Sequence, residues 1–159
     1  MKIFAIILLL AASAYAQDDQ FTMGVGVGVF NSGKHSLSET KALSIGYQED
    51  LWNALKQRAT VGFWFDDAGN GRLSSAFGSG QLGFEVNRDG LIADVFFGPA
   101  AISSPDSLLG GRFQFMESLN LGIQDKFNNY IGLFYRHLSS AGLEMPNIGR
   151  DMVGLEIRF

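Results

Sequence analysis

The chain has 159 residues, of which 47% are hydrophobic and 18% charged, and its formal net charge is −4. That length fits one domain, and the acidic balance argues against a nucleic-acid binder built on a basic surface. The sequence contains no cysteine, which excludes disulfides, thiolate metal sites and a cysteine nucleophile. Its 20 glycines and 14 phenylalanines suit curved β-structure better than a helical bundle.

The first residues are typical of an export signal. A single lysine precedes an apolar run, and Ala14-Tyr15-Ala16 supplies an Ala-x-Ala cleavage site. The apolar run is too short to span a bilayer as a helix, which takes about 20 residues. We therefore expect residues 1–16 to be a signal peptide cleaved after Ala16, and residues 17–159 to form one domain outside the cytoplasm.

Hydrophobicity alternates with period two along the rest of the chain. In the first alternating segment Phe21, Met23 and Val25 share one face, while Thr22 and Gly24 share the other. This period predicts β-strands rather than helices. Eight such segments are present, at residues 21–29, 42–47, 58–65, 82–86, 91–97, 113–121, 131–136 and 153–159.

The connections between these segments differ in length at the two ends of the strands. Short turns are expected at 48–53, 87–90 and 124–129, and longer loops at 31–38, 66–74, 103–111 and 140–150. Short turns at one end and long loops at the other are typical of outer-membrane barrels. We therefore predict an all-β, eight-stranded, antiparallel up-and-down transmembrane barrel. Both termini are expected on the periplasmic side, with the longer loops facing outward.

In such a barrel the bulky apolar faces meet lipid and the opposite faces line the interior. Eight strands enclose only enough space for side chains, so we expect a small packed polar core rather than a channel. Glycines suit that interior, as do the inward charges Arg58, Glu85, Asp94, Glu156 and Arg158. A soluble lipocalin-like barrel would instead place the apolar faces inside, and the large side chains of those faces argue against it.

Some aromatic and charged residues carry separate expectations. Trp52, Trp64 and Tyr130 are candidates for anchors at the membrane interfaces. Glu117 is a misfit, because it falls on the apolar parity of its strand. A bulge and a polar partner both remain open as explanations.

Three polar residues on the apolar parity form the candidate catalytic site. His137 and Ser139 continue the lipid-facing parity of one strand, and Asp151 continues that of the next. Because these strands are antiparallel neighbours, the three side chains are expected to face outward together near the strand ends. Serine, histidine and a carboxylate within such reach supply a nucleophile, a base and its orienter. The alternative is that they contact lipid headgroups, because a charge there costs only about 0–1 kcal/mol.

At these residues the sequence resembles a known family. The stretch His137-Leu138-Ser139-Ser140-Ala141-Gly142, followed by Pro146-Asn147, Gly149 and Asp151, resembles the C-terminal signature of the PagL-type lipid A 3-O-deacylases. The family pattern is His-x-Ser-Asn-Ala-Gly with an acidic residue fourteen positions after the histidine. Two positions depart from it: the acidic member is Asp151 where glutamate is common, and Ser140 replaces the common asparagine.

The resemblance implies an outer-membrane esterase that hydrolyses the 3-O-linked acyl chain of lipid A in lipopolysaccharide. Ser139 would be the nucleophile, His137 the general base and Asp151 its orienter. Ala141 and Gly142 would supply the oxyanion hole, and Asn147 would brace the loop. The chemistry needs no metal or organic cofactor. The partners implied are lipid A and other outer-membrane lipids, with no nucleic acid, and a homodimer stays open.

Two other functions compete with this interpretation. One is a non-enzymatic outer-membrane barrel that serves adhesion or envelope integrity, in which the polar residues only contact headgroups. The other is a soluble lipocalin-like carrier in the periplasm. An esterase acting on phospholipid rather than lipid A is not separable from the first hypothesis by sequence.

Overall fold

The computed structural model of the protein describes residues 19–29, 40–52, 54–66, 72–104, 109–143, 145 and 149–159. The expected signal peptide, residues 1–16, lies outside these ranges, as does the predicted loop at 31–38. The described residues form eight strands that close into one antiparallel barrel, which confirms the predicted fold class. The strands are β1 (Gln20–Val29), β2 (Lys41–Trp52), β3 (Leu55–Asp66), β4 (Arg72–Arg88), β5 (Leu91–Ile102), β6 (Phe113–Gln124), β7 (Tyr130–Ser139) and β8 (Arg150–Arg158).

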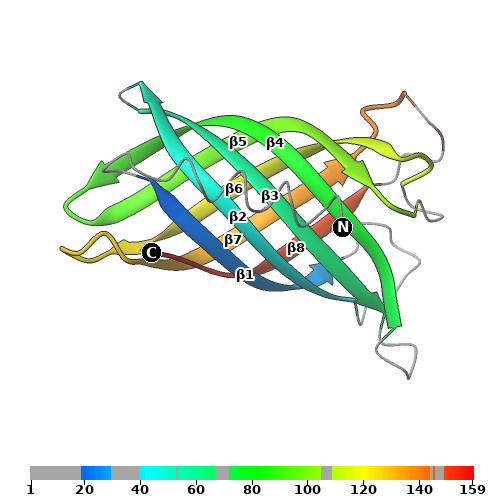
Figure 1. Ribbon diagram of the computed structural model, residues 1–159, viewed down its shortest axis with the longest axis horizontal. Helices are drawn as coiled ribbons and strands as arrows, with labels where there is room; N and C mark the ends of the chain where they lie inside the picture. The colour runs from blue at the N-terminus through cyan, green and yellow to red at the C-terminus, as the bar shows by residue number, and fades with distance from the viewer. Residues whose placement is uncertain are drawn as a thin grey trace, which may run out of the picture.

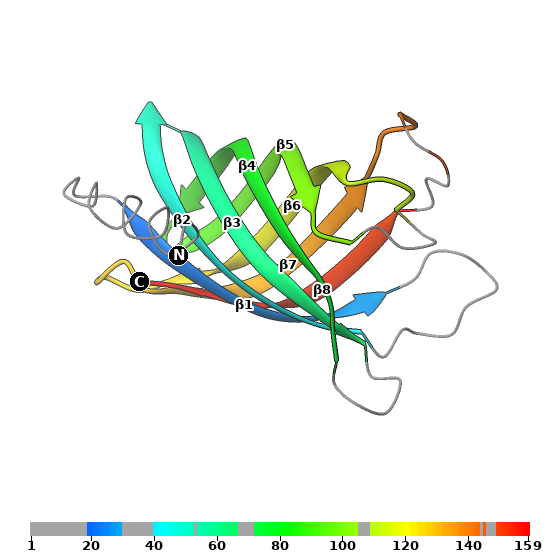
Figure 2. The ribbon, with the colours of Figure 1, turned by 45° about the vertical axis from the view of Figure 1, so that its right-hand side comes forward.

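Each strand pairs with its neighbours in the chain, and β8 closes the barrel against β1. At the closing seam Phe21 and Phe159 exchange two backbone hydrogen bonds. The C-terminus lies at the same end of the barrel as the β4–β5 and β6–β7 turns (Figure 1). The strands run obliquely along the barrel, and the ends of β7 and β8 that carry their connection lie at the opposite end (Figures 1 and 2).

The outer wall is apolar over its whole middle. Along β5 exposed and buried residues alternate without interruption, and the exposed apolar side chains include Leu91, Val95 and Phe97. This pattern follows from the pleat, which sends successive side chains to opposite faces of the wall. An apolar exterior around a closed barrel is the surface of a membrane-spanning protein. Among the described residues no helix is long and apolar enough to span a membrane.

Part of the interior is a network of paired charges. Arg158 forms ion pairs with Glu85 (3.0 Å), Asp94 (2.5 Å) and Glu156 (2.9 Å). Arg136 contacts Glu156 from the other side at 2.5 Å. A charge taken out of water is costly unless it is paired and hydrogen-bonded, and this network meets that condition for most of its members. The predicted inward positions of five charged residues are confirmed: Arg58, Glu85, Asp94, Glu156 and Arg158.

The interior near the β7–β8 connection is apolar, which the prediction of a polar core missed. Trp64, Phe77, Met116, Leu138 and Met152 are buried together there. The Trp64 ring stacks on Phe77 with centroids 4.9 Å apart, and its indole N–H donates to the sulfur of Met152 at 2.9 Å. The barrel therefore has a charged layer and an apolar layer inside.

The prediction of a membrane-interface anchor is wrong for two of the three aromatic residues. Trp64 is only 1% exposed because it packs in the apolar layer. Tyr130 is 2% exposed and points inward, where the Arg158 guanidinium lies 4.0 Å from its ring centroid. Trp52 is 73% exposed at the end of β2, a position compatible with an interface.

Strand ends differ from the predicted boundaries. The expected turn at 48–53 is mostly strand, because β2 continues to Trp52 and pairs with β3 from Leu55 onward. An ion pair of 2.5 Å between Lys56 and Asp50 holds this extension together. β4 is also longer than predicted and begins at Arg72, inside the segment expected to be a loop.

Candidate active site on the outer wall

The candidate site lies on the β7–β8 hairpin. His137 and Asp151 are directly opposite each other in the antiparallel register of these strands. Nδ1 of His137 lies 2.7 Å from Oδ1 of Asp151, and the two side chains are 26% and 11% exposed. Asp151 has one methylene group fewer than the glutamate that is common at this position. Its carboxylate nevertheless reaches the imidazole of His137 while the two strands keep their regular pairing.

The contact with Asp151 bears on which ring nitrogen of His137 carries the proton. An ionised carboxylate accepts hydrogen bonds and donates none, so this contact favours a proton on Nδ1 of the His137 ring. In the neutral ring with Nδ1–H, Nε2 is the nitrogen that can accept a proton. This is the tautomer that a histidine needs to act as a general base toward a hydroxyl group.

Ser139 is the last residue of β7 and lies on the same side of the strand as His137. Residues two apart on a strand are separated by roughly 6.5–7 Å along its axis. In the described part of the chain no hydrogen bond joins the Ser139 hydroxyl to His137. Catalytic hydrogen bonds are often long in substrate-free enzymes and tighten when substrate binds.

A tight turn follows Ser139. The amide of Leu143 donates to the carbonyl of Ser140 at 3.0 Å, and Ala141 and Gly142 between them have φ of 51° and 83°. Two successive positive φ values are typical of a type I′ turn. Ala141 and Gly142 are exposed, and within the described residues their N–H groups donate no hydrogen bond. Asn147 lies outside the described residues.

Gly149 closes the site from the β8 side. Its φ is +83°, and a Cβ atom built on it would lie 2.6 Å from Cε1 and 3.2 Å from Nε2 of His137. The backbone at Gly149 therefore lies close to the Cε1–Nε2 edge of the imidazole ring. Glycine is required here both for the backbone conformation and for the space.

Two residues beside the site were missed or left unexplained by the sequence. The Tyr135 hydroxyl donates to Oδ1 of Asp151 at 2.6 Å, and its parity with His137 is the signal that could have found it. Glu117 is exposed on the outer wall and is paired in register with His137 across β6 and β7. The ladder there is regular, so a bulge does not explain Glu117.

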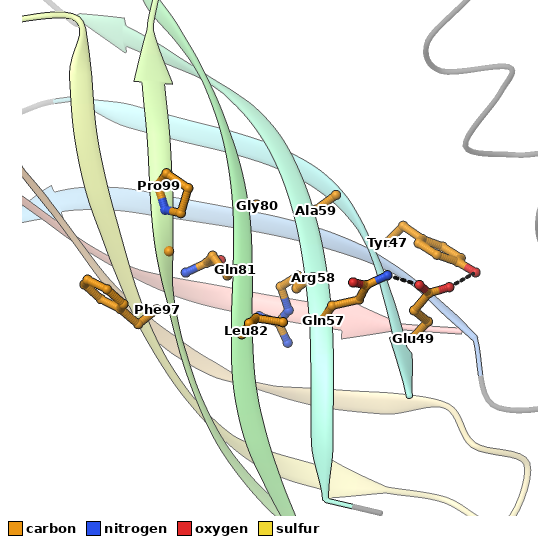
Figure 3. A pocket seen from close by; sticks show the side chains of 11 residues that line it. Tyr47, Glu49, Gln57, Arg58, Ala59, Gly80, Gln81, Leu82, Phe97 and Pro99 are labelled. Atoms are coloured by element: carbon orange, nitrogen blue, oxygen red, sulfur yellow. Dashed lines mark hydrogen bonds between the residues drawn. The ribbon is translucent and has the colours of Figure 1, made fainter. Parts of the chain in front are cut away.

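A hollow of about 530 Å³ lies on another part of the wall, over β2 to β5 (Figure 3). It forms where the small residues Ala59 and Gly80 are flanked by Leu82 and Phe97. At one end Glu49 accepts hydrogen bonds from Tyr47 and Gln57 (Figure 3). None of the three candidate catalytic residues lines this hollow.

Comparison with protein families gives a match over most of the chain. A family model described as lipid A 3-O-deacylase (PagL) matches residues 35–159. The matched region includes seven of the eight strands in full and every candidate site residue.

Similar proteins give a consistent result. Lipid A deacylase PagL of Bordetella bronchiseptica is 41% identical over 70 residues, which is 44% of this chain and 38% of that protein. A crystal structure of the outer membrane enzyme PagL superposes with a TM-score of 0.63, at 20% identity over 88% of this chain and 98% of that one. The Yersinia pestis outer membrane protein Ail superposes with a TM-score of 0.54, at 14% identity over 89% of this chain and 99% of that one. Both structural likenesses show the fold alone.

Proposed function

Because the chain belongs to the PagL family of lipid A 3-O-deacylases, we propose that it is a serine esterase that removes the 3-O-linked acyl chain of lipid A in the outer membrane. The observation that carries this proposal is the 2.7 Å contact between His137 and Asp151 on the outer wall, beside Ser139. A membrane barrel has no structural need for a histidine–carboxylate pair on its lipid-facing side.

In the proposed reaction the Ser139 hydroxyl attacks the acyl carbonyl carbon while Nε2 of His137 takes its proton. The tetrahedral intermediate then collapses, the bond to the sugar oxygen breaks, and His137 returns the proton to that oxygen. Water attacks the acyl-enzyme by the same route and releases the fatty acid and free Ser139. Asp151 keeps the proton on Nδ1 and stabilises the imidazolium that forms in each half-reaction.

The turn after Ser139 supports an oxyanion hole. The N–H groups of Ala141 and Gly142 belong to the turn that the Leu143–Ser140 hydrogen bond closes, and within the described residues they donate to no other group. Each such donor is worth about 3–4 kcal/mol in well-studied hydrolases. We assign Asn147 to bracing the same loop.

The position of the site suits a membrane substrate. The three residues lie where β7 ends and β8 begins, on the wall rather than inside the barrel. The ester of an acylated sugar lies at the boundary between the sugar layer and the acyl layer, so it meets this height of the wall by lateral diffusion. We propose that this end of the barrel faces the outer leaflet, after export directed by residues 1–16.

The test is Ser139→Ala, expressed in cells whose lipid A is then measured by mass spectrometry. We expect a folded, membrane-inserted barrel and lipid A that keeps its 3-O-acyl chain. Ser79→Ala is the matched control, because the Ser79 hydroxyl has no hydrogen-bond partner among the described residues. This control should deacylate lipid A as the wild type does.

Three results would contradict the proposal or its substrate. Complete deacylation by Ser139→Ala would remove Ser139 from the mechanism. Unchanged lipid A in cells with the wild-type protein would favour the non-enzymatic barrel, in which the polar residues contact headgroups. Release of fatty acid from phospholipid vesicles that contain no lipid A would instead assign the esterase to phospholipid.

A further inference from the structure

We propose that Tyr135 is a positioning residue that holds Asp151 in the orientation that His137 requires, an inference that rests on the proposed function above. The Tyr135 hydroxyl donates to Oδ1 of Asp151 at 2.6 Å, and His137 Nδ1 contacts the same oxygen at 2.7 Å. Among the described residues these are the two hydrogen-bond partners of the Asp151 carboxylate. One oxygen is thus held from two directions.

The register explains how Tyr135 reaches this position. Tyr135 is paired with Val153, and Asp151 is paired with His137, so Tyr135 and Asp151 are diagonal neighbours across the β7–β8 ladder. Diagonal positions are about 7–8 Å apart, a distance that the long tyrosine side chain spans and shorter side chains do not. The Tyr135 side chain therefore lies along the wall toward Asp151 instead of pointing straight into lipid.

The imidazole needs this support because it has a second carboxylate beside it. Glu117 on β6 is paired in register with His137 and is exposed on the same face of the wall. A ring flanked by two carboxylates has two acceptors for its N–H proton. The Tyr135 hydrogen bond fixes the Asp151 oxygen in place, so that His137 keeps Nδ1 on Asp151 and leaves Nε2 for the substrate reaction.

The first test is Tyr135→Phe, which removes one hydroxyl and leaves the ring. We expect kcat for lipid A deacylation to fall about tenfold, the loss typical of a hydrogen bond to a charged group. KM should stay unchanged, because the hydroxyl contacts Asp151 and not the substrate. Tyr130→Phe on the same strand is the matched control, since the Tyr130 hydroxyl has no hydrogen-bond partner among the described residues. Heat-dependent gel mobility verifies that each barrel is folded.

A double-mutant cycle separates positioning from a general structural effect. In the Asp151→Asn background, Tyr135→Phe should cause no further loss of kcat, because the carboxylate through which Tyr135 acts is gone. Additive losses in the double variant would overturn the proposal, as would a Tyr135→Phe enzyme with the kcat of the wild type.

A readout without substrate keeps this test independent of the proposed function. The sequence has two histidines, so His35→Gln leaves His137 as the only imidazole in ¹⁵N spectra. We expect the Nδ1–H tautomer with Tyr135 present and in Tyr130→Phe, and a mixture of tautomers in Tyr135→Phe. A single Nδ1–H tautomer in Tyr135→Phe would overturn the positioning role. Wild-type protein that leaves lipid A intact would refute the esterase, while these spectra would still decide the role of Tyr135.

Discussion

Replacement of Gly149 by alanine tests how tightly the backbone defines the candidate site. The new Cβ would lie 2.6 Å from Cε1 of His137, whereas carbon atoms in contact are about 3.5–4.0 Å apart. The ring would have to retreat by about 1 Å, although Asp151 holds its Nδ1 at 2.7 Å. A displacement of about 1 Å costs on the order of 100-fold in rate, so we expect kcat/KM to fall about 100-fold. That loss corresponds to about 2.7 kcal/mol of transition-state stabilisation.

The assay is deacylation kinetics on purified lipid A, beside urea unfolding of the same samples. The positive φ of Gly149 adds a strain of about 1–2 kcal/mol to the folded state of the alanine variant. Gly90→Ala is the matched control, because Gly90 has a φ of +85° and lies in the β4–β5 turn, far from the site. Both variants should lose similar stability, and only Gly149→Ala should lose activity. A kcat/KM of Gly149→Ala within about threefold of the control would refute the argument.

Two further predictions concern the barrel itself. Glu156→Gln should lower the free energy of unfolding by about 3–5 kcal/mol, because it leaves buried arginines without their carboxylate. Urea unfolding of the barrel in lipid measures this change. A loss below about 1 kcal/mol would mean that the charge network is dispensable. Leu133→Arg, at an exposed apolar position in the middle of β7, should cost about 2–4 kcal/mol in a bilayer. Phe127→Arg in the β6–β7 turn is its control and should change stability by less than about 0.5 kcal/mol, so equal losses in the two variants would contradict a lipid-facing position for Leu133.

The strands could be predicted because successive side chains of a strand point to opposite faces. One face of this wall meets lipid and the other meets a packed interior, so hydrophobicity alternates along the sequence. In β5, Leu91 and Val95 face outward while Ile92, Asp94 and Phe96 face inward, as the alternation requires. Strand ends were predicted less well. Near the ends of the strands, the outer and inner faces of the wall are in more similar environments, so the alternation is weaker. Ion pairs such as Lys56–Asp50 then determine where strand pairing stops.

The interior was harder to predict because it depends on which residues meet across strands. Trp64 and Tyr130 were expected at the interfaces, where aromatic residues are frequent. Both side chains fit inside because nearby glycines leave room for them. A Cβ at Gly62 would collide with the Phe77 ring, on which Trp64 stacks. A Cβ at Gly132 would collide with Tyr130. Such pairings need the register, which composition and periodicity do not supply.

In the candidate site, too, periodicity predicts some contacts, while others depend on the strand register and the backbone conformation. The juxtaposition of His137 and Asp151 could be predicted, since parity and a single hairpin place directly opposed residues on one face. The parity of Tyr135 with His137 places it on the same face, but its diagonal contact with Asp151 needs the register as well. The contact of Gly149 depends on backbone torsion angles and a close approach, which the sequence pattern does not supply. The assignment of Ser139 as nucleophile stays a prediction for the experiments above.

Because the site lies on one hairpin, its geometry responds little when the bilayer deforms the barrel. Tyr135, His137 and Asp151 belong to two adjacent strands joined by one connection, so a single ladder of hydrogen bonds sets their spacing. A barrel can be squeezed toward an ellipse, or tilted when the bilayer becomes thinner or thicker, and the distance between distant strands then changes. Adjacent strands keep their separation of about 4.8 Å under the same deformation. The spacing of Tyr135, His137 and Asp151 is therefore insulated from the mechanical state of the membrane.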